Sequence, residues 1–149
     1  QNSSTYGNVY YYPASWVCST AYTSNRNINY DWCAVRLQDN LGAANGWFGK
    51  GVSSGSLKGT EVTISGYPAA TSSKVGYQYT SSGTITSSTD YRVGYSIDTE
   101  GGNSGSPVYD SNGIVWAIHT HGGNSGTRIS SGLYQILQDM YLEGVEKWS

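Results

Sequence analysis

Residues 98–107 read Asp98-Thr99-Glu100-Gly101-Gly102-Asn103-Ser104-Gly105-Ser106-Pro107 and place one serine inside a glycine-rich loop. Glycine reaches backbone angles that a Cβ atom forbids, so such a loop can turn tightly and expose the hydroxyl of Ser104. The same turn can direct the amides of Gly102 and Ser104 toward one point, as an oxyanion hole requires. The competing interpretation is an ordinary turn between two strands.

A serine nucleophile needs a general base, and that base is usually histidine. The sequence has two histidines, His119 and His121, and both follow the serine. The loop by itself therefore indicates a nucleophile without identifying its base.

The composition indicates a β-rich domain of low charge. The 149 residues are enough for one domain with a hydrophobic core. Twenty glycines, 14 tyrosines and five tryptophans, with abundant Ser and Thr, favour short strands joined by turns. Charged residues make up 12% and the net charge is −2, so a nucleic-acid partner is not indicated. No apolar run approaches the roughly 18 residues of a membrane span.

The first residues, Gln1-Asn2-Ser3-Ser4, lack the basic and apolar regions of a signal peptide. Gln1 is not a translation start either, so we expect a chain produced by proteolysis. Low charge with many polar, uncharged side chains is typical of secreted bacterial proteins, and we expect an extracellular location.

The two cysteines are Cys18 and Cys33. A bond between them would close a loop of about 15 residues and contribute roughly 3 kcal/mol in the chain-entropy model. Two free thiols, or bridges to another chain, are the alternatives. With no CxxC pattern and no nearby histidine, neither a metal site nor a redox role is expected, and no cofactor is implied.

Short strand-like runs alternate with turn residues along most of the chain, which suggests a sandwich or a barrel. The final segment differs, because Leu133, Ile136, Leu137 and Met140 recur at helical spacing. It predicts a helix over 131–142, capped by Ser130 or Ser131 and ended by Gly144. The predicted strands are Val9–Tyr12, Ser15–Tyr22, Trp32–Leu37, Glu61–Ser65, Val75–Ser81, Gly83–Ser87, Arg92–Ser96, Pro107–Tyr109, Ile114–Thr120 and Thr127–Ile129.

The run Gly-Asn-Ser-Gly-Ser-Pro at 102–107 resembles the nucleophile loop of chymotrypsin-like serine proteases, and most closely that of the bacterial glutamyl endopeptidases of staphylococci and Bacillus. The resemblance extends from about residue 29 to residue 141 and includes the Ile-x-Gly-Tyr-Pro strand at 64–68. It implies an all-β, double six-stranded β-barrel with a C-terminal α-helix. It also implies that Ser104 is the nucleophile and that the Gly102 and Ser104 amides form the oxyanion hole.

The resemblance assigns the catalytic aspartate to Asp31. The pattern Asp-hydrophobic-Ala-hydrophobic-Arg-Leu opens a strand in this family, and residues 31–37 are similar to it. The implied role is to accept a hydrogen bond from the base and fix its tautomer. Asp39, Asp90 and Asp98 are the competing acids, and none precedes such a strand. A capping or turn aspartate is the alternative interpretation of Asp31.

The segment Ile118-His119-Thr120-His121-Gly122 resembles the strand that forms a wall of the specificity pocket in glutamyl endopeptidases. There the histidine contacts the substrate's glutamate carboxylate, which assigns His119 to substrate binding rather than to catalysis. Thr99 matches the threonine of the same pocket. A buried core histidine is the alternative for His119, and His121 is interpreted as a solvated residue at the rim.

Two positions bear on specificity and activation. Asp98 lies near the pocket base, and an acid there recruits Lys or Arg in trypsin-like enzymes, so specificity for a basic or an apolar residue remains an alternative. Asn103 replaces the aspartate that trypsin-like enzymes pair with a freed N-terminus, so that mode of activation is not available.

The family requires a histidine before the aspartate, yet none precedes Asp31. Residues 1–45 therefore look like the remainder of an N-terminal barrel, residues 46–130 like a C-terminal barrel, and residues 131–149 like a helix and tail. Three explanations remain open. A second chain of the same precursor supplies the histidine, the chain is an inactive fragment, or it is a peptide-binding protein that has given up catalysis. The first predicts a two-chain endopeptidase that cleaves after Glu, and less readily after Asp.

Overall fold

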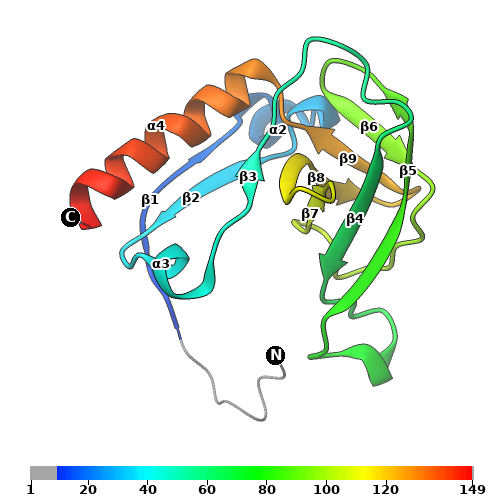
Figure 1. The fold of residues 1–149 in the computed structure, drawn as a ribbon, viewed down its shortest axis with the longest axis horizontal. Coiled ribbons are helices and arrows are strands. Elements are labelled where there is room, and N and C mark those ends of the chain that lie inside the picture. Colours follow the sequence, from blue (N-terminus) through cyan, green and yellow to red (C-terminus); the bar gives the residue numbers. More distant parts are fainter. Residues whose placement is uncertain (1–9, 149) are drawn as a thin grey trace.

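The computed structural model describes residues 10–148 and consists of one closed β-barrel, a small N-terminal sheet and a long C-terminal helix (Figure 1). The expected class, mostly β with a six-stranded barrel and a terminal helix, is confirmed. The barrel is the complete part of the fold. The N-terminal sheet has only the two strands β1 and β2.

Six antiparallel strands form the barrel, and pairing between β8 and β9 closes it. A short strand β3 (Gly49–Lys50) adds to β8 in parallel, outside the closed ring. The six strands are β4 (Glu61–Gly66), β5 (Tyr79–Ser88), β6 (Arg92–Tyr95), β7 (Pro107–Tyr109), β8 (Ile114–His121) and β9 (Ser125–Arg128).

Alternate residues of these strands point inward and form the core, as the two-residue period of a strand requires. In β4, for example, Val62 and Ile64 are buried while Glu61 is exposed. The buried apolar cluster comprises Leu57, Val62, Ile64, Ile85, Val93, Tyr95, Ile97, Val108 and Ala117.

The N-terminal part pairs β1 (Pro13–Cys18) with β2 (Cys33–Leu37) in an antiparallel sheet. Cys18 lies opposite Cys33 in this register, and the two form a disulfide bond. The pairing expected within the chain is therefore present, and no free cysteine occurs among the described residues. The helix α2 (Thr20–Asn25) and the 3₁₀ helix η1 (Ile28–Tyr30) connect β1 to β2, and the short helix α3 (Leu41–Asn45) follows β2.

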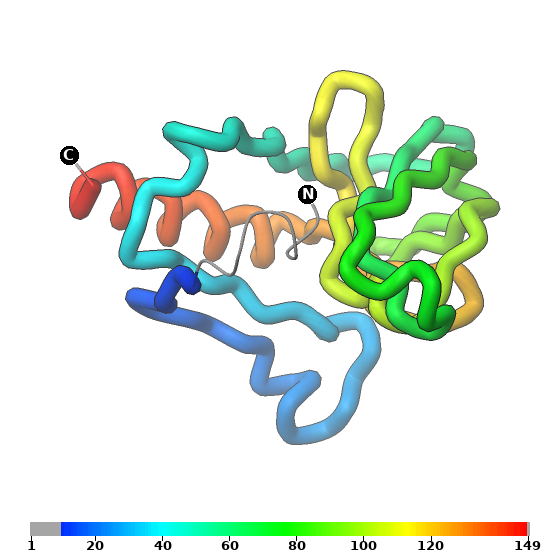
Figure 2. The backbone as a smooth tube through the Cα atoms, turned by 90° about the horizontal axis from the view of Figure 1, so that it is seen from below, coloured from blue at the N-terminus to red at the C-terminus, as the bar shows by residue number. Residues whose placement is uncertain are grey.

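The helix α4 (Ser131–Trp148) lies along the N-terminal sheet (Figures 1 and 2). The backbone N–H of Leu133 donates to Ser130 Oγ, so Ser130 is the predicted cap. The predicted end at Gly144 is wrong, because Gly144 is buried within the helix. A Cβ atom there would lie 2.8 Å from the Trp148 ring, so the absence of a side chain lets the ring pack closely.

Four predicted strands also differ from the structure. The strand expected over Ser15–Tyr22 ends at Cys18, and α2 begins at Thr20. The two strands expected at 75–81 and 83–87 are one strand, β5, because residues 81–83 pair with β4 instead of turning. In the run predicted as a strand from Val9 to Tyr12, Val9 lies outside the described residues and 10–12 carry no element.

Candidate active site

The loop that carries Ser104 connects β6 to β7 at the surface of the barrel, and Ser104 is exposed. Two turns shape it. The amide of Asn103 donates to the Glu100 carbonyl at 3.2 Å, and the amide of Ser106 donates to the Asn103 carbonyl at 3.0 Å. This backbone presents Ser104 at the outside of two successive turns.

Two backbone hydrogen bonds join the loop to strand β8. Gly105 N–H donates to the His119 carbonyl at 2.7 Å, and His119 N–H donates to the Ser106 carbonyl at 2.9 Å. The backbone of the predicted pocket histidine therefore holds the residues that follow Ser104.

The amides of Gly102 and Ser104 have no hydrogen-bond partner within residues 10–148, unlike the neighbouring amides of Asn103, Gly105 and Ser106. Gly102 has a backbone φ of 102°, which residues other than glycine rarely adopt. A Cβ atom there would also meet Ala69 N at 2.5 Å. The loop can thus offer two free donors next to Ser104, which is the chemistry that an oxyanion hole needs.

The strand end at Gly66, within the Ile-x-Gly-Tyr-Pro segment, contacts this loop directly. A Cβ atom on Gly66 would lie 2.8 Å from Asn103 Oδ1 and closer still to Ser106 Oγ. The Gly66 backbone therefore supports both sides of Ser104, and a substitution there would displace the nucleophile loop.

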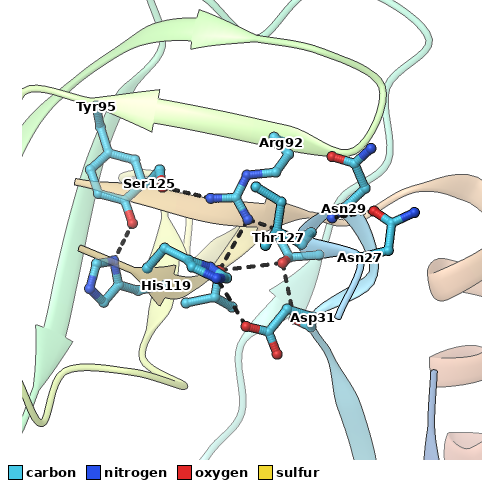
Figure 3. Close-up of polar contacts among 11 residues, drawn as sticks. Asn27, Asn29, Asp31, Arg92, Tyr95, His119, Ser125 and Thr127 are labelled. Carbon is cyan, nitrogen blue, oxygen red and sulfur yellow. Dashed lines mark hydrogen bonds and ion pairs between the residues drawn. The ribbon is translucent and has the colours of Figure 1, made fainter. Parts of the chain in front are cut away.

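Asp31 follows the 3₁₀ helix η1 and precedes β2 by two residues. Thr127 Oγ1 donates to the Asp31 backbone carbonyl at 3.0 Å, which joins the N-terminal part to strand β9. The structure therefore brings the predicted aspartate from the N-terminal part against the barrel that carries Ser104 (Figure 3).

His121 contacts this aspartate, which sequence reasoning did not anticipate. Its Nδ1 lies 3.6 Å from Asp31 Oδ2 and 3.0 Å from Thr120 Oγ1. The side chain is 33% exposed, so His121 is partly open to solvent while it contacts Asp31.

Arg92 is the second residue that sequence reasoning missed, and it connects the same two parts of the molecule (Figure 3). Its guanidinium donates to the Ile28 carbonyl at 3.0 Å, just before Asp31. It also donates to Thr120 Oγ1 at 3.3 Å and to Ser125 Oγ at 2.6 Å. Burial lowers the pKa of Arg92, but a guanidinium stays charged over the physiological range.

Of the predicted pocket residues, His119 lies on β8, and Thr99 contacts the connection between β8 and β9. His119 is buried, and its Nδ1 is hydrogen-bonded to the Tyr95 hydroxyl (Figure 3). Thr99 Oγ1 donates to Asn124 Oδ1 at 2.9 Å, and the Asn124 carbonyl accepts from the Tyr95 amide at 3.0 Å. Asn124 and Tyr95 thus link Thr99 to His119, although no direct bond joins the two.

Burial is the largest influence on the His119 ring and lowers its pKa. A hydrogen bond to the Ser125 backbone opposes this shift, whereas the charges of His121 and Arg92 add to it. His119 is therefore uncharged at neutral pH.

Asp98, the acid that would favour a basic substrate, is exposed. It lines a cavity of about 200 Å³ together with Thr99 and Asn103. Residues 10–148 contain no group of three or more His, Cys, Asp or Glu side chains able to hold a metal ion. Within the same residues, no helix is both long and apolar enough to cross a membrane.

Comparison with known proteins places this geometry in a family. Residues 3–118 match the trypsin-like peptidase domain. The chain is 40% identical to the glutamyl endopeptidase of Bacillus licheniformis over 111 residues, which cover 72% of this chain and 32% of the relative. It is 31% identical over 110 residues to a Bacillus subtilis protein named extracellular metalloprotease, covering 73% and 34%. The chain thus spans about a third of these relatives.

Solved structures support the same fold. A Glu endopeptidase in complex with MPD has a TM-score of 0.81 and 25% identity, covering 93% of this chain and 67% of that chain. The protease Anisep of Arthrobacter nicotinovorans has a TM-score of 0.68 at 20% identity, covering 90% and 66%. An inactivated protease paralogue of the scabies mite has a TM-score of 0.66 at 14% identity, covering 89% of this chain and 69% of that chain.

The chain belongs to the trypsin-like peptidase family and has the chymotrypsin-like fold. Because an inactivated paralogue shares this fold, the fold alone does not decide whether the chain catalyses a reaction. The site residues have to support that conclusion.

Proposed function

We propose that this chain is the larger part of a secreted serine endopeptidase that cleaves after Glu, and less readily after Asp. The observation that carries the proposal is the exposed Ser104 beside two backbone amides, those of Gly102 and Ser104, that have no partner in the described residues. The 40% identity to a glutamyl endopeptidase supports the specificity, and a relative named extracellular supports secretion.

In the proposed reaction, Ser104 Oγ attacks the carbonyl of the scissile bond while a histidine removes its proton. Asp31 accepts a hydrogen bond from that histidine and stabilises its charged form. The amides of Gly102 and Ser104 donate to the oxyanion of the tetrahedral intermediate. Thr99 and His119 donate to the carboxylate of the substrate's glutamate.

The histidine comes from a second chain of the same precursor in this proposal. His119 does not fit the role of base, because it is buried and its Nδ1 is bonded to Tyr95. The N-terminal sheet offers a surface for the partner, since Trp16, Val17 and Val35 are 66%, 42% and 54% exposed there. A larger sheet would cover such residues.

A series of peptides that differ only before the cleaved bond tests the specificity. We expect native material, containing any docked segment, to cleave after Glu far faster than after Gln, Lys or Phe. A preference for Lys would favour Asp98 as the recognition group instead. Ser104→Ala should abolish every cleavage, which controls for contaminating proteases.

Intact mass of the native protein, measured with and without reductant, tests the second chain. We expect an additional polypeptide that is released without reduction, because Cys18 and Cys33 are bonded to each other. A single polypeptide that ends at these 149 residues would instead favour the rival function, a peptide-binding protein without a base.

A further inference from the structure

Tyr95 and His119 form a buried polar pair that the proposed reaction leaves unexplained. They are 4% and 3% exposed, and the Tyr95 hydroxyl is hydrogen-bonded to His119 Nδ1 (Figure 3). The Tyr95 ring belongs to the apolar core of the barrel, and the two ring centroids lie 5.9 Å apart. The hydroxyl is therefore held at a fixed point beside one particular nitrogen of His119.

We propose that Tyr95 is a specificity-determining positioning residue. Its hydroxyl donates to Nδ1 of His119, which holds the neutral ring with its proton on Nε2 and so prepares Nε2–H to bind the substrate's carboxylate. This inference rests on the proposed glutamate pocket and adds the residue that orients its donor.

The direction of the hydrogen bond follows from the two protonation states. Burial, which outweighs the opposing charge of Arg92, raises the pKa of Tyr95 far above its usual range, so the phenol keeps its proton. Burial lowers the pKa of His119, so the ring is neutral and has one donor and one acceptor nitrogen. A protonated phenol beside the acceptor nitrogen forms a normal hydrogen bond.

A second contact of the ring agrees with this assignment. His119 also forms a hydrogen bond with the backbone of Ser125, and that bond raises its pKa, which identifies the ring as the donor. Because Nδ1 is already engaged by Tyr95, Nε2 is the nitrogen that carries the proton.

The consequence for recognition is a donor that needs no charge. A carboxylate is a stronger acceptor than a backbone carbonyl, so a bound glutamate can take over the Nε2–H bond from Ser125. Keeping the empty pocket neutral also avoids burying an imidazolium without a counter-ion. A glutamine side chain offers only a carbonyl oxygen and gains less from the exchange.

The tautomer can be measured directly from imidazole ¹⁵N shifts in the labelled chain, with any docked segment left unlabelled. The chain has two histidines, so His121→Asn assigns their signals. We expect His119 in the neutral Nε2–H form at pH 7. An Nδ1–H form or an imidazolium would overturn the proposal, and this readout remains valid if Tyr95→Phe fails to fold.

Tyr95→Phe supplies the functional test. Tyr109→Phe is the matched control, because the Tyr109 ring packs against Phe48 with the ring centroids 4.6 Å apart. In Tyr95→Phe we expect mixed His119 tautomers and a roughly tenfold fall in the ratio of kcat/KM for Glu over Gln substrates. An unchanged tautomer or an unchanged ratio would overturn the role of Tyr95. If the native enzyme cleaves elsewhere than after Glu, the proposed function fails, whereas the wild-type tautomer still tests the hydrogen bond.

Discussion

The C-terminal barrel and the N-terminal sheet differ in how completely they bury their own apolar residues. In the barrel, Val108 and Ala117 are fully buried, and pairing between β8 and β9 leaves the ring of strands closed. In the β1–β2 sheet, Ala34 is buried while Trp16, Val17 and Val35 are exposed. A two-stranded sheet with an uncovered apolar face is marginally stable by itself.

The same division separates the proposed chemistry. The barrel contains the proposed nucleophile, oxyanion donors and pocket residues, whereas the N-terminal part contributes the proposed catalytic Asp31. Arg92 and Thr127 hold the two parts together through the carbonyls of Ile28 and Asp31. We infer that this chain alone contains the whole barrel. A working site also requires the missing strands of the N-terminal part and the contacts that fix this part to the barrel.

Asp31→Asn tests whether the N-terminal part contributes to catalysis. We expect about a 10⁴-fold loss of kcat with unchanged folding, because an amide cannot hold the base in the required tautomer and charge. Asp39→Asn, which changes another acid of the same region, serves as the control and should keep full activity. Equal activity of the two variants in a peptide-cleavage assay would reduce the N-terminal part to a scaffold.

Replacing both Cys18 and Cys33 by Ala tests whether the two parts differ in stability. We expect a loss of roughly 3 kcal/mol, confined to the N-terminal part, because the disulfide constrains only the segment between its cysteines. Hydrogen exchange should accelerate in β1 and β2 and stay slow in β4–β9. Uniform acceleration would show that the molecule unfolds as a single unit.

Arg92→Met tests the connection between the two parts. The variant leaves the Ile28 carbonyl and two hydroxyls without their donor, so we expect kcat/KM to fall roughly tenfold to a hundredfold. Arg26→Met is a suitable control, since the Arg26 guanidinium lies over the Tyr22 ring, 5.5 Å from its centroid, and makes none of these three hydrogen bonds. If steady-state kinetics of the two variants agree, the connection has no catalytic role.

Asp110→Asn should have the smallest effect, restricted to a turn of the barrel. Burial alone would raise the pKa of Asp110, but hydrogen bonds from Ile114, Trp116 and Asn112 outweigh it and lower the pKa. The carboxylate therefore stabilises the fold above its unfolded pKa of about 3.9, and this contribution disappears as the pH falls through the lower folded value.

Urea unfolding across a range of pH measures this contribution. The wild type should exceed Asp110→Asn by about 1 kcal/mol at pH 7 and match it in strong acid. A difference that persists in strong acid would assign the effect to packing rather than to charge.

The sequence predicted the barrel strands well where apolar and polar residues alternate and where Gly, Ser or Asn residues mark the turns. The prediction failed at Gly83, where Ser-Ser-Gly is typical of a turn but the segment continues as strand. There the Ser82 hydroxyl on β5 is hydrogen-bonded to the Thr63 hydroxyl on β4, and a Cβ atom on Gly83 would lie 2.7 Å from Ser96 Oγ. Gly144 is a similar case. A glycine at this place is typical of a helix end, but here the Trp148 ring packs against it and the helix continues.

In the candidate site, too, some residues could be predicted from the sequence and others could not. Ser104, Asp31, Thr99 and His119 lie in recognisable sequence motifs, so their proposed roles could be stated from the sequence. Arg92 and Tyr95 act through partners 24 or more positions away, and the sequence assigned no role to either. Only the closure of the barrel brings such residues together.

Labelling of Ser104 by a fluorophosphonate tests the central claim most directly, because the reagent reacts with a serine only when a base activates it. The chain should be labelled at Ser104 when it is bound to the His-bearing segment of its precursor, and should stay unlabelled when that segment is removed. Equal labelling in both states would contradict the account by placing the base within this chain. An absence of labelling in both would identify a binding protein instead.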